Sequence, residues 1–142
     1  MAILRVSFGV IILALSLASE VQLLVVARRG FRLLGERRAS GWHSPESIKR
    51  HLRGLWAFVV TTTVMISVIV GGIRLFALPL TPFYYHVHLP LIKAFVGLLI
   101  GASVINGKRF PWGHIILTPL VILAFTIASI TGDMLVVSLF FR

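Results

Sequence analysis

The sequence predicts an all-α integral membrane protein, a bundle of four transmembrane helices with a basic amphipathic cytoplasmic loop. Of its 142 residues, 58% are hydrophobic and only 13% are charged, and the mean hydropathy is +0.99. A chain of this composition has too little polar surface to cover a soluble domain. It also has no cysteine, which excludes disulfides, thiolate metal sites and thiol catalysis.

Four apolar segments are each long enough to cross a hydrocarbon core of ~30 Å. We expect a single transmembrane domain over residues 1–142, with helices at about 6–27, 54–78, 88–106 and 114–140. The first segment could instead be a signal peptide, but its apolar run continues past Glu20, which favours a retained helix. The short turn between the third and fourth segments predicts an antiparallel hairpin.

A basic segment separates the first two spans. Eight of the fourteen lysines and arginines lie between residues 28 and 53, which is typical of a cytoplasmic loop beside anionic lipid headgroups. Phe31, Leu33 and Leu34 among these arginines predict a stretch that lies on the membrane surface. Ser44-Pro45-Glu46 predicts the start of a helix that continues into the second span. No aromatic platform accompanies the charge, so we do not expect nucleic-acid binding.

The same cations predict the orientation. Ten lie in the 28–53 and 107–113 segments, whereas Arg5, Arg74 and Arg142 mark the other side. The positive-inside rule then places both termini outside and the basic loop in the cytoplasm. We expect the membrane to be the bacterial inner (cytoplasmic) membrane.

Three charged residues fall inside the spans: Glu20, Lys93 and Asp133. Such charges are costly in lipid and usually face a protein interior, so we expect all three to be buried, with Lys93 and Asp133 close enough to pair. Lys93, Gly97 and Gly101 share one helical stripe, and we expect this stripe to pack against a neighbouring helix. Small-residue packing alone would also explain the glycines, and a protonated Glu20 could be without function.

The histidines suggest two possible metal sites. His51 and His114 start two parallel helices at one depth, so they are the candidate ligands of a haem b. His86 and His88, two residues apart in what we expect to be extended backbone, could bind copper at the outer face. Anchoring at the membrane interface is the alternative explanation for all four residues.

Several short patterns resemble known families. The sequence R-H-L-R-G at 50–54, the glycines at 71–72, and F-Y-Y-H-V-H-L-P-L-I-K followed by N-G-K-R-F-P look like the CopD-type copper-resistance membrane domain. They also look like the related haem-associated protoporphyrinogen oxidase family of bacterial membranes. The resemblance covers about residues 50–112 and implies functional roles for Lys93 and for His86 or His88. The oxidase family has a histidine in its first helix, and the first span here has none.

We therefore expect a small redox-linked membrane protein that carries haem b or handles copper in electron transport, as a subunit of a larger membrane assembly. One alternative is a non-catalytic accessory subunit that packs against a larger respiratory or photosynthetic complex. Another is a small transporter that uses Glu20, Lys93 and Asp133 as a buried charge relay. No nucleophile–base pair or phosphate-binding loop supports hydrolytic catalysis.

The predicted orientation can be tested by labelling single cysteines, because the chain has none of its own. We expect Ser40→Cys and Thr81→Cys to react with a membrane-impermeant maleimide from opposite sides of intact vesicles. Labelling of both positions from the same side would mean that a span has been miscounted.

Overall fold

The computed structural model describes residues 1–40, 45–104 and 111–141 and confirms the predicted four-helix bundle. The helices are α1 (Ala2–Ser40), α2 (Pro45–Leu75), η1 (Tyr84–His88), α3 (Leu89–Val104) and α4 (Pro111–Phe140). The short element η1 is a π-helix that continues directly into α3. All four long helices are long and apolar enough to cross a membrane, and their outer faces, rich in exposed large hydrophobic side chains, suit contact with lipid.

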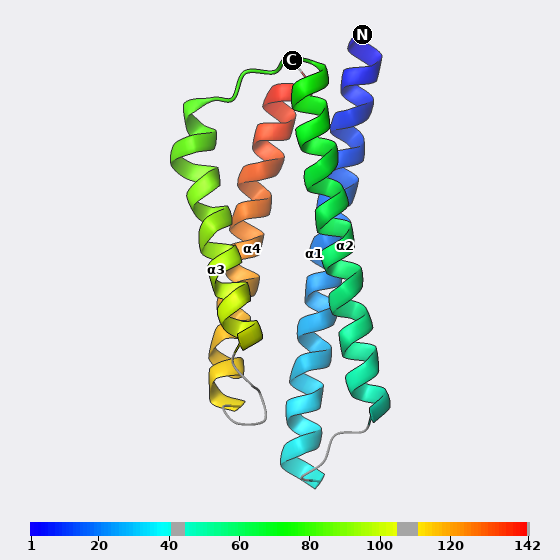
Figure 1. Ribbon diagram of the computed structural model, residues 1–142, viewed down its shortest axis with the longest axis vertical. Helices are drawn as coiled ribbons and strands as arrows, with labels where there is room; N and C mark the ends of the chain where they lie inside the picture. The colour runs from blue at the N-terminus through cyan, green and yellow to red at the C-terminus, as the bar shows by residue number, and fades with distance from the viewer. Residues whose placement is uncertain (41–44, 105–110, 142) are drawn as a thin grey trace.

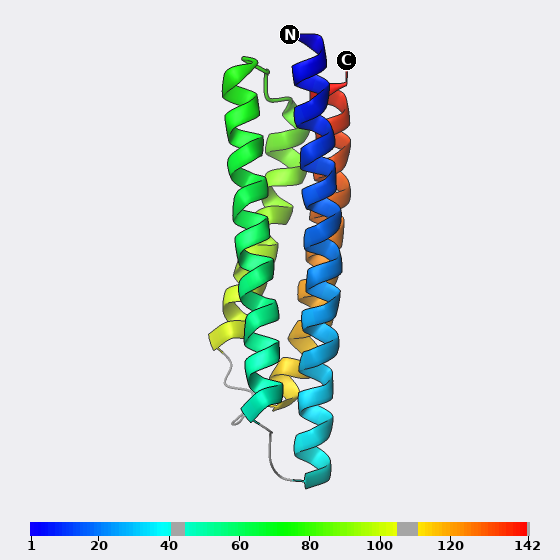
Figure 2. The same ribbon diagram turned by 90° about the vertical axis from the view of Figure 1, so that its right-hand side faces the viewer.

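Both chain termini lie at one end of the bundle, which we call the terminal end (Figures 1 and 2). The 28–53 segment lies at the opposite end, which we call the basic end. The termini and the basic segment are therefore separated by the length of the bundle, as the predicted orientation requires. Which side of which membrane each end occupies remains a prediction.

The basic segment differs from its prediction. No separate surface stretch forms at Phe31 to Leu34, because α1 continues through these residues to Ser40. Helix α2 begins at Pro45, as predicted, and runs unbroken into its apolar part. The capping residue proposed for it, Ser44, and the turn predicted after residue 106 lie outside the described residues.

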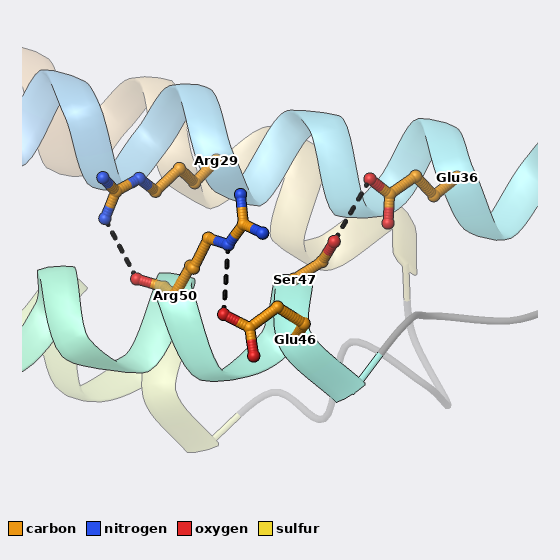
Figure 3. A network of polar contacts seen from close by, with 5 residues as sticks. All are labelled: Arg29, Glu36, Glu46, Ser47 and Arg50. Carbon is orange, nitrogen blue, oxygen red and sulfur yellow. Dashed lines mark hydrogen bonds and ion pairs between the residues drawn. The ribbon is translucent and has the colours of Figure 1, made fainter.

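Polar contacts between α1 and α2 explain why the helices continue side by side at the basic end (Figure 3). The Arg29 guanidinium donates to the Arg50 carbonyl at 3.0 Å, and the Ser47 hydroxyl donates to a Glu36 carboxylate oxygen at 3.5 Å. Within α2, Arg50 also pairs with Glu46 one turn earlier, at 3.3 Å. Each exposed contact of this kind contributes little, but together they link the two helices across a segment that has few apolar residues.

Each neighbouring pair of helices packs except one. Helix α1 packs against α2 and α4, and α3 packs against α4. By contrast, no described residue of α2 comes within 8 Å of α3, measured between Cα atoms. The bundle is therefore closed along three of its four sides, and the side between α2 and α3 is bridged only by side chains.

Two aromatic clusters fill the interior. Nearer the basic end, the Phe58 ring of α2 meets Phe95 of α3 edge-on at 6.5 Å and Phe125 of α4 at 5.3 Å between centroids. Phe58 is only 1% exposed, so its ring spans the gap between α2 and α3. At the terminal end, Phe76 packs edge-on against Phe8 and Phe140.

Helix α2 ends in a Schellman motif that begins the crossing to α3. The Leu78 N–H donates to the Ile73 carbonyl at 3.0 Å, and the Ala77 N–H donates to the Arg74 carbonyl at 3.3 Å. Ala77 occupies the left-handed position with φ 49°, where glycine is the usual residue. The predicted helix end near residue 78 is therefore close to the observed end at Leu75.

The adjacent glycines of α2 provide a matched test of the terminal-end packing. A Cβ atom on Gly72 would lie 2.9 Å from the Phe140 ring, whereas one on Gly71 would meet nothing within 4 Å among the described residues. We expect Gly72→Ala to lower the free energy of unfolding by about 1–3 kcal/mol, because a packed ring would have to move. Gly71→Ala should be neutral or slightly stabilising, since alanine favours the helix. The two variants are compared by thermal or denaturant unfolding in detergent, monitored by circular dichroism. Equal effects of Gly72→Ala and Gly71→Ala would contradict the packing of Gly72 against Phe140.

Candidate functional site

A cavity of about 260 Å³ lies in the centre of the bundle, lined by all four long helices and by His88 of η1. Its walls are mostly apolar and include the three rings of the aromatic cluster nearer the basic end. Ser16, Ser129, Asp133, His88 and Thr62 contribute polar atoms. A largely apolar pocket with a few convergent polar groups is the usual form of a small-molecule site.

The cavity extends from the middle of the apolar spans towards the terminal end, where His88 and Asp133 line it. Ser129 is close to the middle of the span Ile115–Phe140, and Thr62 is close to the middle of Pro45–Leu75. Polar groups at this depth have no water to bond to, so they must find partners inside the protein or in a bound molecule.

Serines and threonines join three helices beside the cavity. The Ser16 and Ser129 hydroxyls of α1 and α4 lie 3.4 Å apart, and Thr62 of α2 donates to the Ser19 hydroxyl at 3.5 Å. Ser16 and Ser19 are 3% and 0% exposed. Small hydroxyl side chains of this kind allow helix backbones to approach closely and bond across the interface.

Asp133 is the carboxylate of the site. It lines the cavity from α4, as Ser16 does from α1, and lies near enough to the Ser16 hydroxyl to interact with it. Glu20, one turn beyond Ser16, is near enough to act on Asp133 electrostatically and is itself half-buried. The α1–α4 interface therefore gathers two carboxylates and buried hydroxyls, which together can hold a proton or accept hydrogen bonds from a ligand.

His88 is held in one orientation by α4. Its Nδ1 lies 3.0 Å from the Thr131 hydroxyl oxygen, and that hydroxyl is 3.0 Å from the carbonyls of Ile127 and Ala128. A hydroxyl has one proton to give, so when Thr131 donates to a carbonyl, His88 Nδ1–H must be the donor to Thr131.

The opposite nitrogen of the ring is consequently an acceptor. In the neutral imidazole, Nε2 keeps its lone pair when Nδ1 carries the proton. His88 Nε2 lies 3.6 Å from the position that a Cβ on Gly132 would occupy, and Gly132 lines the cavity. Because glycine leaves this space open, the imidazole reaches the cavity wall and can accept a hydrogen bond or ligate a metal.

Lys93 corrects the prediction of three buried charges. Its side chain is exposed on the outside of α3, and the described residues give it neither a hydrogen bond nor an ion pair, so it does not pair with Asp133. Gly97 and Gly101 lie on the same outward stripe, and a Cβ on either would meet no described atom within 4 Å. Within the described bundle no helix packs against this stripe, because α3 turns Phe95 inward and η1 turns His88 inward instead.

His86 and His88 do not have the expected extended backbone. They lie in the π-helix η1, whose first carbonyl, that of Tyr84, accepts from the Leu89 N–H. His86 is exposed, whereas His88 is half-buried against Thr131. The two imidazoles therefore face different surroundings, and a copper site formed by both remains a prediction without support from their placement.

The predicted haem pair is only half described. His51 is half-buried, and its imidazole packs against α1, 3.3 Å from where a Cβ on Gly30 would lie. His114 belongs to α4, but its side chain lies outside the described residues. Within the described part of the chain, no group of three or more His, Cys, Asp or Glu side chains is arranged to hold a metal ion.

Sequence reasoning missed three contributors to the site: Ser19, Thr131 and Gly132. Ser19 follows Ser16 by one turn, and Gly132 adjoins Asp133, so both could have been found by following the small residues around the two acids. The pairing of Thr131 with His88 has no comparable signal, because it depends on how η1 meets α4.

Comparison with protein-family models, with curated proteins and with solved structures finds no match to this chain. The class of protein is therefore defined by its fold and cavity: a membrane four-helix bundle with a largely apolar internal cavity that a few polar side chains line.

The assignment of the His88 protons can be tested by ¹⁵N NMR of the protein in detergent or nanodiscs. We expect neutral His88 to show Nδ1 protonated and Nε2 unprotonated, the less common form of free histidine. Thr131→Val removes the acceptor and should shift the population towards Nε2–H. Thr126→Val, on the same helix, serves as the control and should leave the His88 signals in place. An Nε2–H ring in the parent protein would contradict the assignment.

Proposed function

We propose that this protein binds a small amphipathic molecule inside the membrane, in the central cavity, with the polar group of that molecule between His88 and Asp133. The observation that carries the proposal is the cavity itself, which combines apolar walls with an imidazole, a carboxylate and two serine hydroxyls. Polar atoms inside the membrane are favourable only when they are hydrogen-bonded, and a ligand with its own donors would bond the acceptor sites that His88 Nε2 and Asp133 retain.

The separation of α2 from α3 supports entry from the bilayer. The two helices face each other across the cavity without packing their backbones together. Thr62 and Ile66 of α2 and Ile92 and Val96 of α3 line it from the two sides. A hydrophobic molecule dissolved in lipid would reach the site by displacing flexible side chains, with no need to cross water.

The polar atoms favour a ligand with carbonyl or hydroxyl groups on an apolar ring. His88 Nε2 accepts a hydrogen bond, Ser16 and Ser129 can donate or accept, and Asp133 can hold a proton. A lipid-soluble quinone has this chemistry, since its oxygens gain and lose protons as the ring is reduced and oxidised. A quinone ligand would also agree with the redox-linked function predicted from the sequence.

Haem b is the second candidate, and one observation favours it. Metal-ligating histidines usually donate their other ring N–H to an oxygen acceptor, and His88 donates Nδ1–H to Thr131 in this manner. His88 would then be the residue that holds the haem, in place of the predicted pair His51 and His114. The haem would supply one-electron chemistry, and this chain would bind and orient it.

The transporter alternative loses one member of its relay, because Lys93 is exposed and only Glu20 and Asp133 remain together. The accessory-subunit alternative does not conflict with ligand binding. A bundle that holds a redox cofactor can also be a subunit of a larger assembly, and we retain that role as part of the proposal.

The first experiment identifies the ligand. The protein is purified in lipid nanodiscs, its absorbance is recorded in the oxidised and reduced states, and an organic extract is analysed by mass spectrometry. The quinone proposal expects a stoichiometric quinone in the extract and no haem bands. A reduced-minus-oxidised haem spectrum would support the second candidate. If the extract contains no quinone, the spectrum shows no haem and added short-chain quinone does not bind, both the quinone candidate and the haem candidate are contradicted.

Matched variants then place the ligand. We expect His88→Gln to weaken quinone binding about tenfold, the loss of roughly one good hydrogen bond, whereas His86→Gln, two residues away and exposed, should match the parent.

Ala128→Leu should abolish binding because Ala128 is buried in the cavity wall. Ala94→Leu, on the exposed side of α3, is its control. Equal effects within either pair would rule out the cavity as the site.

A further inference from the structure

Lys93 lies at the midpoint of a membrane span. It is nine residues from each end of the candidate span Tyr84–Ala102. At 1.5 Å per residue, its Cα is about 13 Å from either end, too far for its side chain to bring the ammonium group to the headgroups. The side chain is exposed on the outside of the bundle, so its charge is directed at lipid rather than at protein.

No acidic residue of this chain is placed to neutralise it. The sequence has four acids. Asp133 faces the cavity with Glu20 nearby, while Glu36 and Glu46 lie in the polar contacts of the basic end (Figure 3). A charged group in the hydrocarbon region is costly unless it is paired, so the counter-charge must come from outside the chain.

The surface around Lys93 suits the approach of a helix. Gly97 and Gly101 follow it at one-turn intervals on the same stripe of α3, and a Cβ on either would meet no described atom within 4 Å. The stripe therefore has two small residues beside open space, with an ammonium group at one end. In membranes, such small-residue faces allow two helix backbones to pack closely.

We propose that this face of α3 docks a transmembrane helix of another protein, which places an Asp or Glu carboxylate against Lys93. Charge complementarity favours this partner, because a carboxylate would neutralise the Lys93 ammonium group. Two copies of this chain meeting symmetrically through the same face would bring Lys93 against Lys93, which is repulsive. Lys93 does not line the central cavity, so the docking face is independent of the ligand proposed above.

The test uses the full chain in phosphatidylcholine vesicles together with a defined partner. A synthetic Leu-Ala transmembrane peptide carries a small-residue stripe and one Glu at its centre, and a second peptide has Gln there. A fluorophore on the peptide and one on a Thr81→Cys label of the chain report association by energy transfer. We expect the Glu peptide to bind the parent at least tenfold more tightly than it binds Lys93→Met, whereas the Gln peptide should not distinguish the two.

Two further variants separate docking from general effects. Gly97→Leu should weaken binding of the Glu peptide, because a large side chain keeps the docked helix at a distance, and Gly71→Leu, on an open face of α2, should not. Lys93→Met should keep the parent's unfolding temperature in detergent, because Lys93 supports no contact within the described bundle. Equal binding of the Glu peptide to the parent and to Lys93→Met would overturn the proposal. So would self-association of the chain that Lys93→Met abolishes, because the occupant would then be a second copy.

Discussion

Satisfaction of polar groups at the α1–α4 interface is the constraint on which the rest of the structure depends. Lipid offers no hydrogen bonds, so the Ser16 and Ser129 hydroxyls bond each other across this interface, and Asp133 lies close to Ser16 rather than facing lipid. These contacts, together with the Arg5 guanidinium that donates to the Leu139 carbonyl at the terminal end, join the first and last helices. Because α2 packs on α1 and α3 packs on α4, the central cavity lies where the two pairs face each other.

The sequence predicted those features of the fold that depend on a single helix and not on how two helices pack. The four spans follow from hydropathy, and the start of α2 at Pro45 follows from local capping preferences. Ser129 and Asp133 are four residues apart, a spacing that puts both on one stripe of a helix, and both line the cavity. The fold class and the inner face of α4 were therefore predictable, since each requires only the helical repeat.

The site could not be predicted where it depends on the rotation of one helix against another. Lys93 was expected to face Asp133, but the Phe95 ring packs between Phe58 and Phe125 and so fixes the opposite face of α3 towards the interior. The π-helical turn of η1 adds a second difficulty. It shifts the register of His86 and His88 relative to α3, so a regular helical repeat does not show which imidazole turns inward.

Helix α3 thus has two chemically distinct faces and few attachments. It packs only against α4 among the described long helices, with η1 at one end and the ring of Phe58 reaching it across the cavity. A ligand in the cavity would contact α2 and α3 together, whereas a helix docked at Lys93 would press on the outer face of α3. Both events would act on the same lightly held element. If α3 changes position when a helix docks at Lys93, the cavity and the docking face are coupled. Thermodynamic reciprocity then requires that ligand binding and helix docking change each other's affinity by the same factor.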